Sequence, residues 1–166
     1  MLSGELATLL TGRYVEINLL PLQFSEYHDF ILSKSPNLSK MEILANFIHY
    51  GGIPEYNKQL TISEKQADMF ANSILKTIVE KDIFQRLNIT NKHDFNKILD
   101  FIFDSVGSYV STRSISDTLR SNGTVVDKQT VAKYLDAMCE AYLIYKVSRF
   151  EIKGKGLLQT LNKYYV

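Results

Sequence analysis

Apolar positions in the first 22 residues predict one helix followed by one strand. Leucines recur at helical spacing over Leu2–Leu10, and Gly12 ends that pattern. The run Tyr14–Leu20 is typical of a strand, which Pro21 closes. A strand this apolar needs sheet neighbours, and no further strand pattern follows soon after it. We therefore expect residues 1–22 to be the remnant of a larger sheet-containing core.

Three helical patterns follow and predict a bundle over residues 23–90. Their approximate limits are 24–35, 41–50 and 63–87. The second pattern stops at Gly51-Gly52, and the third begins at Ser63, which forms a capping box with Gln66. Apolar residues recur every three to four positions in each pattern, so each helix has one face to bury.

A different order of elements is predicted for residues 91–166. Asn91 and Asp127 have the residue types that cap the first and third of three helices. A β-rich run then covers residues 143–152, a glycine-containing turn covers 153–156, and a second strand covers 157–166. Three helices followed by a β-hairpin are the order of a winged helix-turn-helix. The predicted fold class is therefore mainly α with a small β-hairpin: a helical lid bundle followed by a winged helix-turn-helix.

The amino-acid composition favours a folded protein without membrane spans, structural disulfides or metal sites. Hydrophobic residues make up 45% of the 166 positions and charged residues 22%, which is typical of a folded domain. No apolar run is long enough to span a bilayer, so no membrane partner is expected. Cys139 is the single cysteine, which predicts a cytoplasmic protein without structural disulfides. Neither the three histidines nor Cys139 show metal-ligand spacing, and no metal site is expected.

Charge differs mildly between the two parts of the chain. Residues 1–91 carry 8 Lys and Arg against 10 Asp and Glu, whereas residues 92–166 carry 11 against 8. The second part therefore has a net charge of +3, which permits a nucleic-acid partner. Strong nucleic-acid binders are usually far more basic, so the charge alone does not require one.

Six stretches of the sequence are similar to one known group of proteins, in the same order and from end to end. They are Leu2–Tyr14, Leu20–Tyr27, Gly51–Tyr56, Lys81–Ile83, Thr130–Leu135 and Lys163–Tyr165. With them the chain resembles AAA+ ATPases, specifically the predicted bacterial and archaeal ATPases whose AAA core is followed by an uncharacterised C-terminal region. The resemblance implies three parts: the end of the AAA core at 1–22, the lid at 23–90 and the winged helix at 91–166.

The same resemblance implies neighbouring parts that this sequence does not contain. In that family a P-loop core comes first and a nuclease-like domain often follows. No Gly-x-x-x-x-Gly-Lys-Ser/Thr motif occurs here, so the backbone cradle for ATP phosphates is absent from the sequence. We expect a piece of a longer protein, truncated at both ends, that does not hydrolyse ATP alone. ATP and Mg²⁺ would bind only in the intact protein.

Two candidate sites for the nucleotide follow from the resemblance. Arg13 occupies the place of the arginine finger, which reaches a nucleotide held by the neighbouring subunit of an oligomer. The alternative is that Arg13 merely caps a helix C-terminus. Gly51, Gly52 and Pro54 match a turn that lies against the adenine base in related ATPases. The alternative there is an ordinary helix stop followed by a loop.

The third helix of residues 91–166 is the candidate partner-binding element. Its first turn offers polar side chains to phosphates or base edges, and the predicted wing adds two lysines. The candidate residues are Lys128, Gln129, Thr130, Lys133, Lys153 and Lys155. Asp136 and Glu140 share the outward face and would repel a phosphate backbone. DNA binding is therefore expected to be weak and non-specific, and docking of a protein stays open.

Two functions are consistent with these patterns. The first is the lid and winged-helix portion of a AAA+ ATPase, which couples the nucleotide state to binding of DNA or a protein partner. The second is a non-enzymatic winged-helix regulator that binds DNA, or an adaptor that binds proteins. A P-loop in the sequence preceding this chain would distinguish them.

Overall fold

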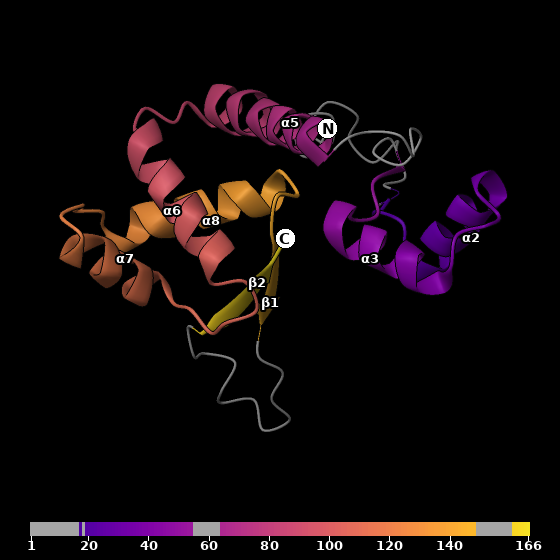
Figure 1. Cartoon of the computed structure of the whole chain (residues 1–166). Helices are drawn as coiled ribbons and strands as arrows, with labels where there is room; N and C mark the ends of the chain where they lie inside the picture. Colours follow the sequence, from indigo (N-terminus) through magenta and orange to yellow (C-terminus); the bar gives the residue numbers. More distant parts are fainter. Residues whose placement is uncertain (1–16, 18, 55–63, 149–160) are drawn as a thin grey trace. The chain divides into compact units, whose positions relative to one another are not determined.

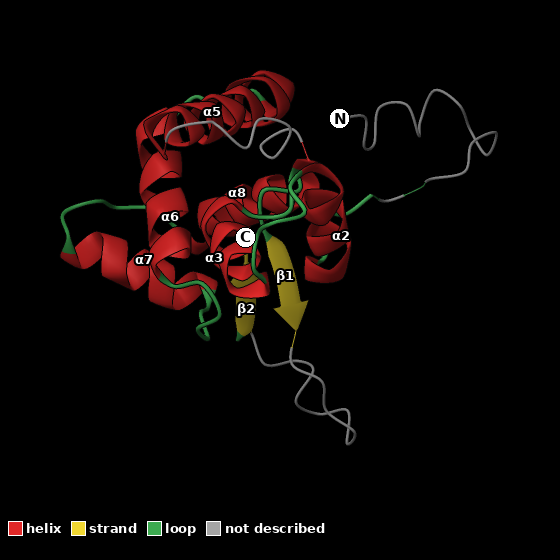
Figure 2. Cartoon of the chain, turned by 45° about the vertical axis from the view of Figure 1, so that its right-hand side comes forward, coloured by secondary structure: helices red, strands yellow, loops and turns green. Residues whose placement is uncertain are grey.

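The computed structural model describes residues 17, 19–54, 64–148 and 161–166. Helices make up most of these residues, and two short strands form a hairpin, so the predicted mainly α class is confirmed (Figure 2). Contacts divide the described residues into a unit within residues 10–75 and a unit within residues 76–166. The two units are described separately.

The 10–75 unit contains α2 (Phe24–Lys34), α3 (Lys40–Tyr50) and most of α5 (Glu64–Thr77) (Figure 1). Capping boxes start the first two helices. Gln23 pairs with Glu26 before α2, and Ser39 pairs with Glu42 before α3. Each box satisfies backbone N–H groups that the first helical turn leaves without partners. The predicted starts of these two helices are thus fixed by local sequence.

The buried core of α2 and α3 is small. Tyr27, Ile31 and Ile43 are fully buried, and partly buried apolar side chains surround them. Phe47 packs against both Phe24 and Tyr27, with ring centroids 5.5 and 5.1 Å apart. Tilted aromatic pairs of this kind add to the burial of apolar area. Two short helices therefore close on one cluster of aromatic and β-branched residues.

The predicted strand Tyr14–Leu20 is not present where the structure describes it. Ile17, Leu19 and Leu20 adopt no regular structure and are exposed by 77, 90 and 67%. A strand is stable only when a neighbour takes up its backbone hydrogen bonds, and the described residues offer no such neighbour to this segment. The predicted helix over Leu2–Leu10 lies outside the described residues.

The 76–166 unit begins with a π-helix, η1 (Ile78–Gln85), which continues the chain of α5. The sequence predicted one helix to about Leu87, and the structure changes its winding after Thr77. Val79, Ile83 and Phe84 of η1 are buried, and Phe84 meets Phe95 edge-on at 5.0 Å. This packing places η1 with the second unit, whereas the predicted boundary lay at 90/91.

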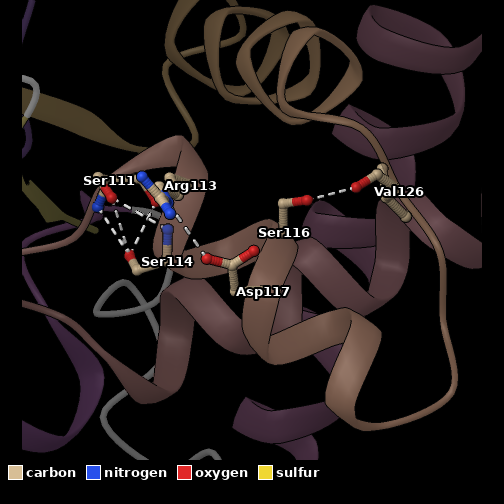
Figure 3. Close-up of polar contacts among 6 residues, drawn as sticks. All are labelled: Ser111, Arg113, Ser114, Ser116, Asp117 and Val126. Carbon is tan, nitrogen blue, oxygen red and sulfur yellow. Dashed lines mark hydrogen bonds and ion pairs between the residues drawn. The ribbon is translucent and has the colours of Figure 1, made fainter.

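Three further helices follow, namely α6 (Lys92–Asp104), α7 (Thr112–Ser121) and α8 (Lys128–Glu140). The first and third helices start at the predicted caps, Asn91 and Asp127. Asn91 accepts from the Asp94 N–H and caps α6. Ser111 and Ser114 form a capping box before α7, where Arg113 also pairs with Asp117 at 3.5 Å (Figure 3).

A buried hydrogen bond fixes the turn between α7 and α8. Ser116, buried in α7, donates its hydroxyl to the Val126 carbonyl at 2.6 Å (Figure 3). Gly123 provides the left-handed residue of this turn, with φ of +81°. Lys97 of α6 donates to the hydroxyl of buried Thr124 in the same turn. A buried donor without a partner is costly, so these bonds specify how α7 leads into α8.

The hairpin consists of β1 (Tyr145–Ser148) and β2 (Asn162–Tyr165), which pair antiparallel. Both strands fall within the predicted β-runs, and the residues between them, 149–160, lie outside the described part of the chain. Tyr145 pairs with Tyr165, and Lys146 pairs with Tyr164. The link between α6 and α7 joins them, because Val110 and Asn162 exchange hydrogen bonds of 2.9 and 3.0 Å.

The core of the 76–166 unit draws on every one of these helices. Its fully buried side chains are Ile83, Phe95, Ile98, Ile102, Ile115, Val131, Met138 and Ile144. Phe95 lies between Phe84 of η1 and Tyr134 of α8, with ring centroids 5.0 and 5.4 Å away. The buried stripe of α6 consists of Phe95, Ile98, Leu99 and Ile102, and α8 contributes Val131, Leu135 and Met138.

Candidate functional site

Gly52 of the predicted nucleotide turn packs against the chain itself. The Leu22 N–H donates to the Gly52 carbonyl at 2.8 Å, which ties the turn after α3 to the residue before α2. A Cβ at position 52 would lie 2.1 Å from the Leu22 carbonyl oxygen. The small size of Gly52 is therefore required by its own fold, and this side of the turn is closed to a ligand.

Gly51 is required for a different reason. It ends α3 with φ of +71° and ψ of −173°, a conformation that residues with a Cβ rarely adopt. No atom lies within 4 Å of the place where its Cβ would be. One side of Gly51 is therefore open, and Pro54 beyond it is exposed. Arg13, the predicted finger, lies outside the described residues.

The N-terminus of α8 is already occupied by a carboxylate. Asp127 accepts from the backbone N–H groups of Gln129 and Thr130 at 2.8 and 2.9 Å. The Thr130 hydroxyl also donates to Asp127, at 2.7 Å. Hydrogen bonds from Thr130 and Gln129 lower the pKa of Asp127, so the cap is a stable anion. A phosphate that approaches the candidate contacts Lys128, Gln129 and Thr130 would therefore meet this negative charge.

The exposed face of α8 has charges of both signs. Lys128, Gln129, Lys133 and Asp136 are exposed, as predicted from the helical period. Glu140 is exposed too, but Arg86 donates to its carboxylate at 2.9 Å. No local pattern indicates this pair, since 54 residues separate the two partners. The structure thus brings Lys128, Gln129, Thr130 and Lys133 onto one helix, while Lys153 and Lys155 lie outside the described residues.

Buried Tyr164 and half-buried Cys139 lie where α8 meets the hairpin. Burial, and then the nearby Cys139 and Asp136, raise the pKa of Tyr164 to about 12. Burial and Asp136 likewise raise the pKa of Cys139. A thiol with a raised pKa is a poor nucleophile, so Cys139 has a packing role here.

Metal-binding clusters and membrane-spanning helices are both absent from the described residues. In that part of the chain no cluster of His, Cys, Asp and Glu has the arrangement that holds a metal ion. None of the described helices combines the length and the apolar character needed to cross a membrane.

Comparisons with known proteins give a family but no activity. An uncharacterised protein of Haemophilus influenzae is 36% identical over 166 residues, which are all of this chain and 41% of that protein. Uncharacterised protein MJ1544 of Methanocaldococcus jannaschii is 27% identical over 173 residues, covering all of this chain and 38% of that protein. The chain therefore spans about two fifths of the length of these curated relatives.

No solved structure gives a significant match to the chain. The model of one protein family, described as a domain of unknown function, matches residues 41–166. That stretch includes α3, α5 and the whole 76–166 unit. The chain accordingly belongs to the DUF8612 family.

Proposed function

We propose that this chain is the lid and winged-helix portion of a AAA+-type ATPase. Residues 23–90 would close over a nucleotide held by the rest of the protein, and residues 91–166 would hold a partner. The chain is not catalytic alone, since its sequence has no phosphate cradle. ATP and Mg²⁺ belong to the intact protein, which is expected to be a homo-oligomer if Arg13 acts on a neighbouring subunit.

The observation that carries the winged-helix part is the order of elements in the 76–166 unit. Helix α7 passes into α8 through a turn held by Ser116, and a hairpin follows α8. The link between α6 and α7 also adds a backbone bridge to β2 at Val110. Helix, bridging segment, two helices and hairpin are the order that a winged helix-turn-helix has.

The ATPase part is supported by sequence motifs and by length. The curated relatives continue well beyond the matched region, which leaves room for a nucleotide-binding core in each. Gly51 supports the lid assignment, because its open side would let a flat ligand approach the backbone closely. Gly52 would then hold the turn in place through Leu22 without touching the nucleotide.

The α8 face favours a protein partner over duplex DNA. Lys128 and Lys133 are opposed by Asp136, and the Asp127 carboxylate occupies the helix N-terminus. A phosphate backbone gains little from such a surface, whereas mixed charges give specificity to protein docking. Any duplex binding through α8 is therefore proposed to be weak and salt-sensitive.

An adaptor without ATPase function is the second candidate. The local roles of Gly51 and Gly52 favour it, because helix termination and close packing on Leu22 account for both glycines without a nucleotide. In that case the 10–75 unit would serve as a docking or dimerisation element, and the 76–166 unit would act as the regulator or adaptor module.

ATP hydrolysis by the full-length Haemophilus influenzae relative tests the choice. We expect the relative to bind ATP and release phosphate, and the 166-residue chain to release none above a buffer blank. Repurification of both proteins controls for contaminating ATPases. Absence of ATP binding by the folded relative would remove the ATPase proposal in favour of the adaptor. Steady phosphate release by the chain itself would contradict the proposal that it is not catalytic alone.

A further inference from the structure

The outer side of the hairpin presents aromatic side chains to solvent. Tyr164 of β2 is buried, so its neighbours Lys163 and Tyr165 lie on the opposite side of the strand. Residues directly opposite in an antiparallel pair share a face, which places Tyr145 with Tyr165 and Val147 with Lys163. The link between α6 and α7 contributes a third ring, because the Lys163 ammonium lies 4.6 Å from the centre of the Tyr109 ring.

These five residues form what we call the hairpin face: Tyr109, Tyr145, Val147, Lys163 and Tyr165. Tyr109 is exposed by 60%, Val147 by 48%, Tyr165 by 41% and Tyr145 by 38%. Tyr165 rests on the backbone of Gly107, where a Cβ would lie 3.5 Å from its ring. The face therefore combines three exposed tyrosines, of which two are held by local contacts, with one ammonium group and no carboxylate.

We propose that the hairpin face binds single-stranded nucleic acid, without strong preference for sequence. Exposed aromatic rings give successive bases surfaces on which to stack, and every base has such a surface. Lys163 supplies a positive charge among the rings, where a backbone phosphate needs one. The inference goes beyond the proposed function, since it requires neither the lid nor the α8 face.

Charge argues for a single strand rather than a duplex or a second copy of the chain. A duplex hides the faces of its bases and is held mainly through phosphates, so one ammonium group would contribute little. A second copy would bring Lys163 toward its own equivalent across a two-fold axis, because such an interface repeats the same patch. A single strand satisfies both features of the face, since it offers exposed bases and negative charge together.

Fluorescence anisotropy of the 166-residue chain with a short labelled oligothymidylate tests the proposal. We expect binding at low salt that exceeds binding to a duplex of equal length. Tyr109→Ala and Tyr165→Ala should each weaken it by roughly fivefold or more, the effect of losing one stacked base. Tyr109→Phe and Tyr165→Phe should bind nearly as the parent does, because phenylalanine keeps the stacking surface.

Two lysine variants distinguish a direct contact between Lys163 and a phosphate from a non-specific effect of the chain's positive charge. Lys163→Gln should lower the slope of log affinity against log salt by about 0.7, the value for one contact to a single strand. Lys146→Gln removes a charge from β1 on the other side of the hairpin, opposite Tyr164, and should leave the slope unchanged. Circular dichroism of every variant confirms folding, and the lysine pair tests the face without altering a ring.

Each other outcome overturns the proposal. Absence of binding at low salt would do so, as would tighter binding to the duplex or equal affinity of the Ala and parent chains. The remaining alternative is that the hairpin face binds a second copy of the chain. Light scattering tests it, since a dimer that Tyr109→Ala dissociates would assign the face to that contact.

Discussion

The two units of this chain bury their apolar residues to different extents. In the 76–166 unit, side chains from η1, α6, α7 and α8 all reach one core, with Phe95 and Met138 fully buried. In the 10–75 unit, α2 and α3 share a core of three fully buried residues. Met41 and Ile48 lie seven residues apart on α3, which places them on one helical face, and both remain more than 70% exposed.

The difference in burial indicates which unit is stable without further packing partners. A core built from several helices offsets the conformational entropy of ordering them, whereas two short helices around three buried residues do so only marginally. The exposed stripe of α3 is also what a helix shows when its second neighbour lies elsewhere in a longer protein. We therefore expect the 76–166 unit to be the more stable of the two and to unfold separately.

Phe95→Ala should have the largest effect, because it removes a ring that joins η1, α6 and α8. A loss of about 3–5 kcal/mol in the free energy of unfolding is expected, as for other buried aromatic residues. Urea unfolding measures the loss, and hydrogen exchange locates it in the 76–166 unit. Phe103→Ala on the same helix, at a half-exposed position, is the control. Equal loss of protection in α2 and α3 would show that the units unfold together.

In the 10–75 unit, Gly52→Ala should cause a large loss in the free energy of unfolding, although it adds only one methyl group. Its new Cβ would lie 2.1 Å from the Leu22 carbonyl oxygen, so backbone must move. We expect a cost of about 3 kcal/mol, at the upper end for overpacking. Gly123→Ala in the other unit meets no atom and bears only the strain of its φ of +81°, about 1 kcal/mol. Thermal unfolding of both variants compares the two costs, and a larger effect of Gly123→Ala would contradict the described packing.

Alkaline pH should destabilise the 76–166 unit because Tyr164 loses its proton. Burial raises the pKa of Tyr164 to about 12 from an ordinary value of 10.0. The folded protein therefore holds this proton more tightly than the unfolded chain, and the resulting stabilisation is complete below pH 10 and lost as pH approaches 12. Tyr164→Phe should make the unfolding midpoint less sensitive to pH in this window. The exposed neighbour Tyr165→Phe is the control, and identical pH profiles of Tyr164→Phe and the parent would refute the argument.

Glu140→Gln should have the smallest effect, because its ion pair with Arg86 is partly exposed to solvent. A loss of about 0.2–1 kcal/mol is expected, and added salt should reduce it. A double-mutant cycle with Arg86→Gln isolates the pair, and Asp136→Asn on the same helix is the control. A coupling energy that salt does not change would mean that the pair is more shielded than its exposure indicates.

Local sequence was enough to predict most helix starts and the class of the fold. Asn91 and Asp127 cap helices where the residue types indicated, because capping involves only neighbours in the chain. The same local view failed for the segment around Leu19, since a strand depends on a partner that the sequence pattern cannot supply. The resemblance implied a nucleotide contact at Gly52, and only the structure shows that Leu22 fills the space beside this residue.

The sequence by itself determined the mainly helical class, the positions of the caps and the two short β-runs, because these follow from periodicity and from neighbouring residues. Tertiary structure alone decided that Arg86 pairs with Glu140 and that η1 packs on α6. It also decided that Tyr109 joins Lys163 on the hairpin face. Each of these contacts joins residues from different elements, and a periodic pattern has no information on which elements meet.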